Sequence, residues 1–151
     1  MNALKQFNPQ SAWFGLGAMV VILAGCAGMA AVTLSGDQQN PPVTTSASGT
    51  STITVGADMS VSGSVTTTGV AGTAAHIHNG AAGKNGPIVI GLTKTGDNVW
   101  SVPAGAKLTD AQYEIYKAGG LYVNVHSAAN KGGEVRAQLK PGGGSGMGSS
   151  Y

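Results

Sequence analysis

The sequence predicts an all-β fold, a Greek-key antiparallel β-sandwich or barrel with one short helix. Short runs rich in Val, Ile and Thr alternate with Gly, Asn, Asp and Pro, a spacing typical of strands joined by tight turns. One segment has the period of a helix instead. The chain has 151 residues, enough for one domain with a buried core beside its terminal segments.

Eight segments have the apolar and β-branched content of strands. Polar and glycine-rich residues bound each of them, so every segment is short. The strands are expected at residues 31–34, 49–55, 59–67, 74–78, 87–92, 99–102, 121–126 and 134–139.

Residues 108–120 predict the single helix. Thr109 can accept a hydrogen bond at its start, and Gln112 completes a capping box. Ala111 and Ile115, four residues apart, indicate its buried face, and a Gly-Gly pair ends it. We expect this helix to cover one end of the sandwich.

Residues 1–25 predict a lipoprotein signal peptide. A positively charged start precedes an uncharged apolar run, which is typical of export signals. The run closes in Leu-Ala-Gly-Cys at Cys26, which resembles the lipobox of bacterial lipoproteins, whose cysteine thiol carries lipid. The alternative is an uncleaved membrane anchor, because residues 11–34 lack charged side chains and can span about 30 Å of hydrocarbon. Either interpretation places the remainder in the bacterial cell envelope, periplasmic or at the outer surface.

The remaining chain is expected to form a short tether at residues 26–31, a β domain at 32–141 and a flexible Gly/Ser tail at 142–151. Cys26 is the only cysteine, so the β domain excludes disulfides, thiol catalysis and iron–sulfur clusters. With 8 Lys and Arg against 6 Asp and Glu, the charge is nearly balanced. Such a balance argues against nucleic acid as a partner.

The three histidines give the strongest functional signal. Two of them, His76 and His78, alternate on one predicted strand and therefore share a face, and His126 ends another strand. If the two strands are neighbours, three imidazoles converge, which is the minimum ligand set of a copper or zinc site. The alternative is that the histidines are incidental surface or core residues.

Copper is the expected ion and zinc the alternative. Divalent copper outranks zinc at nitrogen ligands, and zinc more often recruits a fourth protein ligand. Asn124, Tyr122 and Glu134 are the candidates for that ligand or for supporting contacts, whereas Val123 and the other alternate residues of that strand fill the core. For Glu134 we favour a same-face pair with Arg136 that fixes the last strand.

Two further expectations concern the surroundings of the histidines. Residues 79–87 are rich in Gly and Asn, so we favour a simple hairpin connection over a rim that shapes access to the metal. We also expect replacement of His76, His78 or His126 by alanine to leave the metal-free fold nearly as stable, because imidazoles that face a metal add little core packing.

Residues 34–139 resemble the CHRD domain, a module named after chordin and common in bacterial exported proteins. The resemblance implies a β-sandwich outside the cytoplasm. Gln39 and Asn40 depart from the family pattern, which has a glutamate and an apolar residue there. The matching motifs are Leu34-Ser35-Gly36 with Gln38, Pro41-Pro42-Val43, Ala74-Ala-His-Ile-His78 with Gly80, Asn85-Gly-Pro87, Leu108-Thr109, Leu121-Tyr-Val-Asn-Val-His126 and Gly132-Gly133-Glu134-Val-Arg136-Ala-Gln-Leu139.

The histidine pattern also resembles the copper half of a copper–zinc superoxide dismutase site, so the fold is expected to be superoxide-dismutase-like or immunoglobulin-like. The chain lacks the further histidines and aspartate of the zinc half, and dismutase activity is not expected. We expect a cell-surface, lipid-anchored protein that sequesters, delivers or senses copper.

Two other classes of function remain open. The first is a structural or adhesion module that binds other surface proteins or a second copy of itself, with incidental histidines. The second is a copper redox enzyme, which would need an open coordination position. The expected partners are thus the metal ion, the membrane through the lipid anchor, and a protein.

Overall fold

The computed structural model describes residues 31–141, which form eleven strands and one helix. The predicted signal peptide, Cys26 and the Gly/Ser tail lie outside the described residues. The elements are β1 (Val32–Ser35), β2 (Ser48–Ser51), β3 (Thr54–Val55), β4 (Val61–Ser62), β5 (Ser64–Thr68), β6 (Gly72–Asn79), β7 (Ile88–Gly91), β8 (Thr93–Gly96), β9 (Val99–Ser101), α1 (Asp110–Lys117), β10 (Leu121–Ser127) and β11 (Val135–Gln138).

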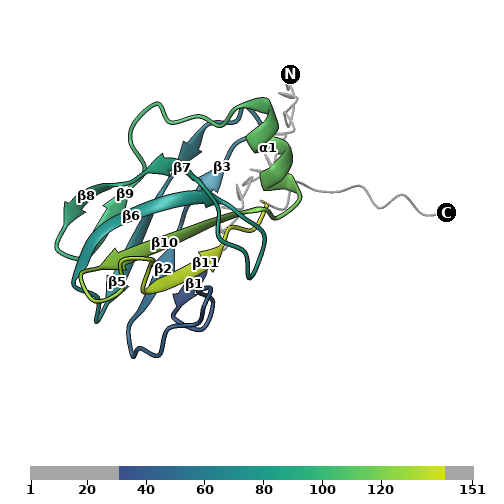
Figure 1. Ribbon diagram of the computed structural model, residues 1–151. Helices are drawn as coiled ribbons and strands as arrows, with labels where there is room; N and C mark the ends of the chain where they lie inside the picture. Colours follow the sequence, from purple (N-terminus) through teal and green to yellow (C-terminus); the bar gives the residue numbers. More distant parts are fainter. Residues whose placement is uncertain (1–30, 142–151) are drawn as a thin grey trace, which may run out of the picture.

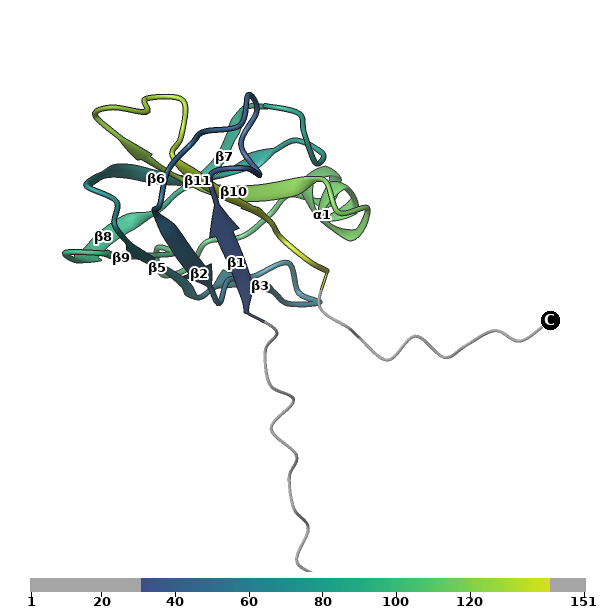
Figure 2. The same cartoon turned by 90° about the horizontal axis from the view of Figure 1, so that it is seen from below.

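Nine strands form one antiparallel sheet in the order β7-β6-β10-β11-β1-β2-β5-β9-β8, and β3 pairs with β4. The long sheet curls into a nearly closed barrel or sandwich (Figures 1 and 2). Strands far apart in the sequence become neighbours, because β1 pairs with β11 and β6 with β10. The predicted all-β antiparallel fold with one short helix is confirmed.

The strand boundaries differ from the prediction in two places. Residues 49–55 divide into β2 and β3, and residues 59–67 divide into β4 and β5. Gly63, between β4 and β5, has a φ of +112°, a conformation that L side chains rarely adopt. The prediction missed β8, because its Thr-Lys-Thr-Gly sequence is exposed throughout and has no apolar alternation to reveal it.

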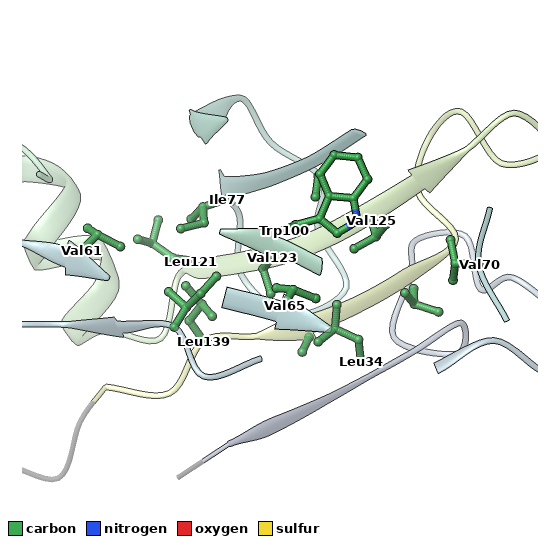
Figure 3. Close-up of a cluster of buried hydrophobic side chains, with 14 of the residues drawn as sticks. Leu34, Val61, Val65, Val70, Ile77, Trp100, Leu121, Val123, Val125 and Leu139 are labelled. Atoms are coloured by element: carbon green, nitrogen blue, oxygen red, sulfur yellow. The ribbon is translucent and has the colours of Figure 1, made fainter. Parts of the chain in front are cut away.

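The core fills the space enclosed by the sheet. Ile77 on β6 and Val123 and Val125 on β10 are fully buried there, and Trp100 from β9 packs in the same interior (Figure 3). Burial of each aliphatic side chain of this size stabilises the fold by about 1.5–3 kcal/mol. The expectation that alternate residues of β10 fill the core is confirmed.

Helix α1 has the predicted capping box. The Thr109 hydroxyl accepts a hydrogen bond from the Gln112 backbone N–H, and the Gln112 side chain accepts one from the Thr109 backbone N–H. The Tyr116 hydroxyl donates to the carbonyl of Lys140, so the helix is tied to the end of the domain. Ala111, expected on the buried face, is exposed. In the described part of the chain, no helix has the length and apolar content needed to cross a membrane.

The other face of β6, β10 and β11 is polar, and much of it is also buried. Asn124 is 2% exposed and Arg136 1% exposed, although neither points into the core. The loop of residues 79–87 folds over this side, and its carbonyl groups accept hydrogen bonds from the strand side chains. We call this side the outer face; it carries His76, His78, Tyr122, Asn124, His126, Arg136 and Gln138.

Candidate metal centre

The register between β6 and β10 brings the three histidines together. Asn124 pairs with His76, and His126 lies two residues further along β10, so its side chain projects from the same face. His76 and His78 share that face because they alternate on β6. Figure 1 shows the two strands side by side. The expectation that β6 and β10 are neighbours is confirmed.

The imidazole rings form a compact cluster. One potential ligand nitrogen from each of His76, His78 and His126 lies within 4.8 Å of the others. Two nitrogens bound to one zinc ion are at most about 4.2 Å apart, because each metal–nitrogen distance is about 2.1 Å. The cluster must therefore contract before all three nitrogens can bind one metal ion. Among the described residues, no carboxylate joins this cluster.

Backbone carbonyl groups fix the protonation of two rings. His78 Nδ1 lies 2.9 Å from the carbonyl oxygen of Gly86, and His126 Nδ1 lies 2.8 Å from that of Lys131. A carbonyl oxygen only accepts, so each Nδ1 carries the hydrogen and each Nε2 of a neutral ring carries a lone pair instead. Metal-binding histidines are held by the same kind of contact, which orients the ring and raises its basicity.

His76 is bound differently, because its partner is another histidine. Its Nδ1 lies 3.0 Å from Nε2 of His126, and it must donate because that Nε2 carries no hydrogen. A metal ion bound by the cluster would have to replace this hydrogen bond. His76 would then either carry its hydrogen on Nε2 or turn its ring, so it is the histidine that would have to rearrange.

The pKa values of two histidines favour the neutral form that metals require. Burial lowers the pKa of His76 below 6.5, and the neighbouring His126 and His78 lower it further. Burial likewise lowers the pKa of His78, although its hydrogen bond to Gly86 partly opposes this effect. Since protons compete with the metal for the same nitrogens, a lowered pKa keeps these ligands available at mildly acidic pH.

Tyr122 packs against His78, and Arg136 packs against Tyr122. The ring of Tyr122 stacks on His78 with centroids 4.9 Å apart and planes 3° from parallel. The guanidinium carbon of Arg136 lies 3.4 Å from the Tyr122 centroid. The Tyr122 hydroxyl accepts a hydrogen bond from the Gly86 N–H at 3.3 Å. Tyr122 thus orients His78 and its carbonyl partner through its ring and hydroxyl.

Glu134 neither joins the cluster nor pairs with Arg136, so the favoured role was wrong. Its carboxylate accepts a hydrogen bond from the Thr45 hydroxyl at 2.8 Å, and contacts with Ser127, Thr45 and Asn130 lower its pKa. The guanidinium of Arg136 instead donates hydrogen bonds to two side-chain oxygens, of Asn85 and Gln138, and to the backbone carbonyl oxygen of Ala81. Each charge is satisfied by nearby polar groups, which removes the reason for the predicted pair.

Asn124 lies between the histidines and the loop that holds His126. Its Nδ2 donates to the Gly132 carbonyl at 3.4 Å, while its Oδ1 is buried without a hydrogen-bond partner. Nε2 of His78 is also buried without one. Gly133 leaves room for the amide, because a Cβ at that position would collide with Asn124 Nδ2. Two unpartnered buried atoms therefore occur on this face, on Asn124 and on His78.

The residues that sequence analysis missed act through their backbones. The loop of residues 79–87, interpreted as a simple connection, supplies the carbonyl of Gly86 to His78. A Cβ on Gly86 would collide with the carbonyl of Asn79, so glycine is required there. Lys131 contributes its carbonyl in the same way. Neither carbonyl has a sequence signature, although the glycines of the loop indicated a tight approach.

A pocket lies against the loop of residues 129–133, whose Lys131 carbonyl accepts from His126. Its volume is about 400 Å³, and residues 129–133, Gln39, Pro41 and Asn85 line part of it. No histidine belongs to its lining. The cavity shares the loop of Lys131 with the cluster but is a separate feature of the surface.

Comparison with protein-family models identifies the CHRD domain over residues 30–139. No curated protein and no solved structure matches the chain. The matched region contains every described strand, the helix and the three-histidine cluster. The resemblance noted in the sequence is thus confirmed, and the chain belongs to the CHRD domain family.

Proposed function

We propose that this protein is a lipid-anchored metal-binding protein of the bacterial cell envelope that holds one copper ion on His76, His78 and His126. The observation that supports it best is the orientation of two ring nitrogens. Carbonyl groups accept from Nδ1 of His78 and of His126, so both Nε2 atoms carry lone pairs within one cluster, where that of His126 accepts from His76. Incidental histidines have no physical reason to share this arrangement.

Copper suits this ligand set better than other common ions. The cluster consists of imidazoles alone among the described residues, and imidazole nitrogen favours copper over zinc in the order of divalent affinities. Magnesium and calcium prefer oxygen ligands and fit the cluster poorly. Zinc remains the alternative, because it also binds imidazole well.

Partial exposure of the cluster favours sequestration, delivery or sensing. His76 and His126 are half-buried, and His76 pairs across the sheet with Gly91, which has no side chain to cover it. A metal ion can therefore be reached from solvent at His76. The envelope location and the anchor at Cys26 are supported by the export signal and by the lipobox resemblance.

Metal analysis of untagged protein tests the proposal. After equilibration with divalent copper and removal of the excess, one copper ion per chain is expected. His76→Ala should lose most of this metal. Thr66→Ala, a matched change at an exposed position on β5 far along the sheet, should retain it.

Wild-type protein that takes up no copper and no zinc would contradict the proposal. The structural or adhesion role would then be preferred, with the histidines as part of a polar surface. Equal copper uptake by wild type and by His76→Ala would place any bound metal elsewhere.

A further inference from the structure

Two buried atoms on the outer face have lone pairs and no hydrogen-bond partner. They are Nε2 of His78 and Oδ1 of Asn124. The two side chains lie within reach of each other: burial lowers the pKa of His78, and Asn124, which would accept a hydrogen bond from a protonated ring, partly opposes this effect. Buried acceptors without donors are rare in folded proteins and cost stability, so this pair requires an explanation.

While His78 is neutral, neither atom can satisfy the other. Nδ1 of His78 carries the ring hydrogen because it donates to Gly86, so Nε2 has none to offer. The Asn124 amide is held with Nδ2 toward the Gly132 carbonyl, so Oδ1 is the atom left on the other side. Both atoms are therefore acceptors in the same buried region, and a positively charged species is the natural partner for both.

We propose that Oδ1 of Asn124 is the fourth ligand of the metal ion held by the three histidines. The proposal rests on the proposed function and adds to it the identity of the fourth ligand. Asn124 pairs directly with His76 across the sheet, and His126 follows two residues later on its own strand. The register and the contact with His78 thus place Asn124 next to all three histidines on the outer face.

The position of the amide is restrained before any metal binds. Asn124 is 2% exposed, and its Nδ2 contacts the Gly132 carbonyl. The absent Cβ of Gly133 creates the space for that amide group. A ligand held in this way costs little ordering when the metal arrives.

An amide oxygen ligand affects which metal ion, and which oxidation state of copper, the site prefers. Oxygen ligands suit divalent ions, whereas monovalent copper prefers soft ligands and does not depend on a fourth, hard one. A set of three imidazoles and one amide oxygen should therefore select divalent copper, or zinc, over monovalent copper. Asn124 is in this account the residue that sets the preferred oxidation state.

Two variants separate ligation from support. Asn124→Leu has a similar size but removes the oxygen, and Asn124→Asp keeps an oxygen while losing the amide donor to Gly132. Untagged wild type and variants are titrated with divalent copper and with monovalent copper under reducing, oxygen-free conditions, using competing chelators. Circular dichroism of each protein verifies folding.

The ligand role predicts an asymmetric result. Asn124→Leu should bind divalent copper about 10- to 100-fold more weakly, a loss typical of disturbed metal sites, while its affinity for monovalent copper changes by less than about threefold. Asn124→Asp should keep its affinity for divalent copper. X-ray absorption should show one nitrogen or oxygen neighbour fewer around divalent copper in Asn124→Leu.

Other results overturn the inference. Equal weakening of both copper ions by Asn124→Leu and by Asn124→Asp would show that the amide only supports the fold. Should Asn124→Leu fail to fold, loss of divalent copper from folded Asn124→Asp would contradict the ligand role equally. Wild type that binds no metal at all would instead defeat the proposed function itself.

Discussion

The two faces of β6 and β10 differ in the side chains that they bury: the inner face is apolar and the outer face is polar. On the inner face, Ile77, Val123 and Val125 contact other apolar side chains and need no specific partner. On the outer face, His78 and Asn124 are nearly as buried but must find hydrogen bonds. The inner face therefore stabilises the fold through burial, whereas the outer face depends on loops that bring the right atoms to it.

The polar partners of the outer face come from two loops. Residues 79–87 supply a carbonyl to His78, and residues 127–133 supply carbonyls to His126 and Asn124. On this face, Nε2 of His78 and Oδ1 of Asn124 remain without a hydrogen-bond partner. We therefore expect changes on the inner face to act mainly on stability and changes on the outer face to act mainly on the proposed metal binding, and each of the following changes tests that division.

The largest effect is expected on the inner face. Ile77→Ala should lower the free energy of unfolding by about 2–5 kcal/mol, because it removes buried methylene groups and leaves a cavity. Denaturant unfolding of metal-free protein measures this loss. If Ile77→Ala stays folded, its copper affinity should change little. A loss of copper binding without a loss of stability would contradict the expected difference between the two faces.

Gly86→Ala is expected to damage the outer face through the backbone. The added Cβ would collide with the carbonyl of Asn79, so the loop must move and His78 loses its carbonyl partner. Copper affinity should fall about 10- to 100-fold, as for other losses of a contact behind a metal-binding histidine. Gly83→Ala is the control in the same loop, because its added Cβ meets no other atom. Its φ of +71° favours glycine, so some backbone strain remains in this control.

A chelator competition assay compares the two glycine variants. Gly83→Ala has no atom within 4 Å of the added Cβ and should retain most of the affinity. Equal losses in both variants would assign the effect to general loosening of the loop.

The histidines themselves should differ in what they contribute without metal. His78 is 7% exposed and stacks on Tyr122, so His78→Ala should cost about 1–3 kcal/mol of unfolding free energy. His76 is half-buried and pairs with Gly91 on the strand beside it, so His76→Ala should change stability by about 0.5 kcal/mol or less. The sequence suggested little cost for either, whereas the burial and the Tyr122 stack of His78 lead us to expect a cost for that variant.

Thermal unfolding of the two metal-free variants is the measurement. Equal melting temperatures for His76→Ala and His78→Ala would contradict the supporting role of the Tyr122 stack.

The smallest effect is the pH dependence of the metal-free fold. Burial lowers the pKa of His76 and of His78 in the folded state, so the unfolded chain binds protons more readily near pH 6.5. The stability that comes from the neutral rings is therefore fully present above about pH 6.5 and is lost as the pH falls toward the lowered values.

Melting temperatures between pH 7.5 and pH 5 measure this loss. The decline should be shallower in His78→Ala, which lacks the more buried of the two rings. Identical slopes for wild type and this variant would mean that burial does not hold the ring neutral.

The sequence predicted what depends on strand periodicity. The period of two placed His76 and His78 on one face, and the pairing of β6 with β10 added His126. The capping box at Thr109 was readable for a similar reason, since it depends on local spacing. The family match then confirmed the resemblance to the CHRD domain over residues 30–139.

What the sequence could not predict depends on contacts between distant loops. Glu134 lies two residues from Arg136, yet each charge found other partners, because the loop of residues 79–87 brings carbonyl oxygens to the guanidinium. The carbonyl groups behind His78 and His126 are present at every residue of every protein and carry no sequence signal. Only the folded chain shows which of them meet a histidine.

The central claim is that three imidazoles bind one ion, and pulsed electron paramagnetic resonance of the divalent copper complex tests it most directly. The account predicts couplings from the remote nitrogens of three imidazoles in the wild type and of two in His76→Ala. A copper signal without imidazole couplings, or a spectrum that His76→Ala leaves unchanged, would contradict it.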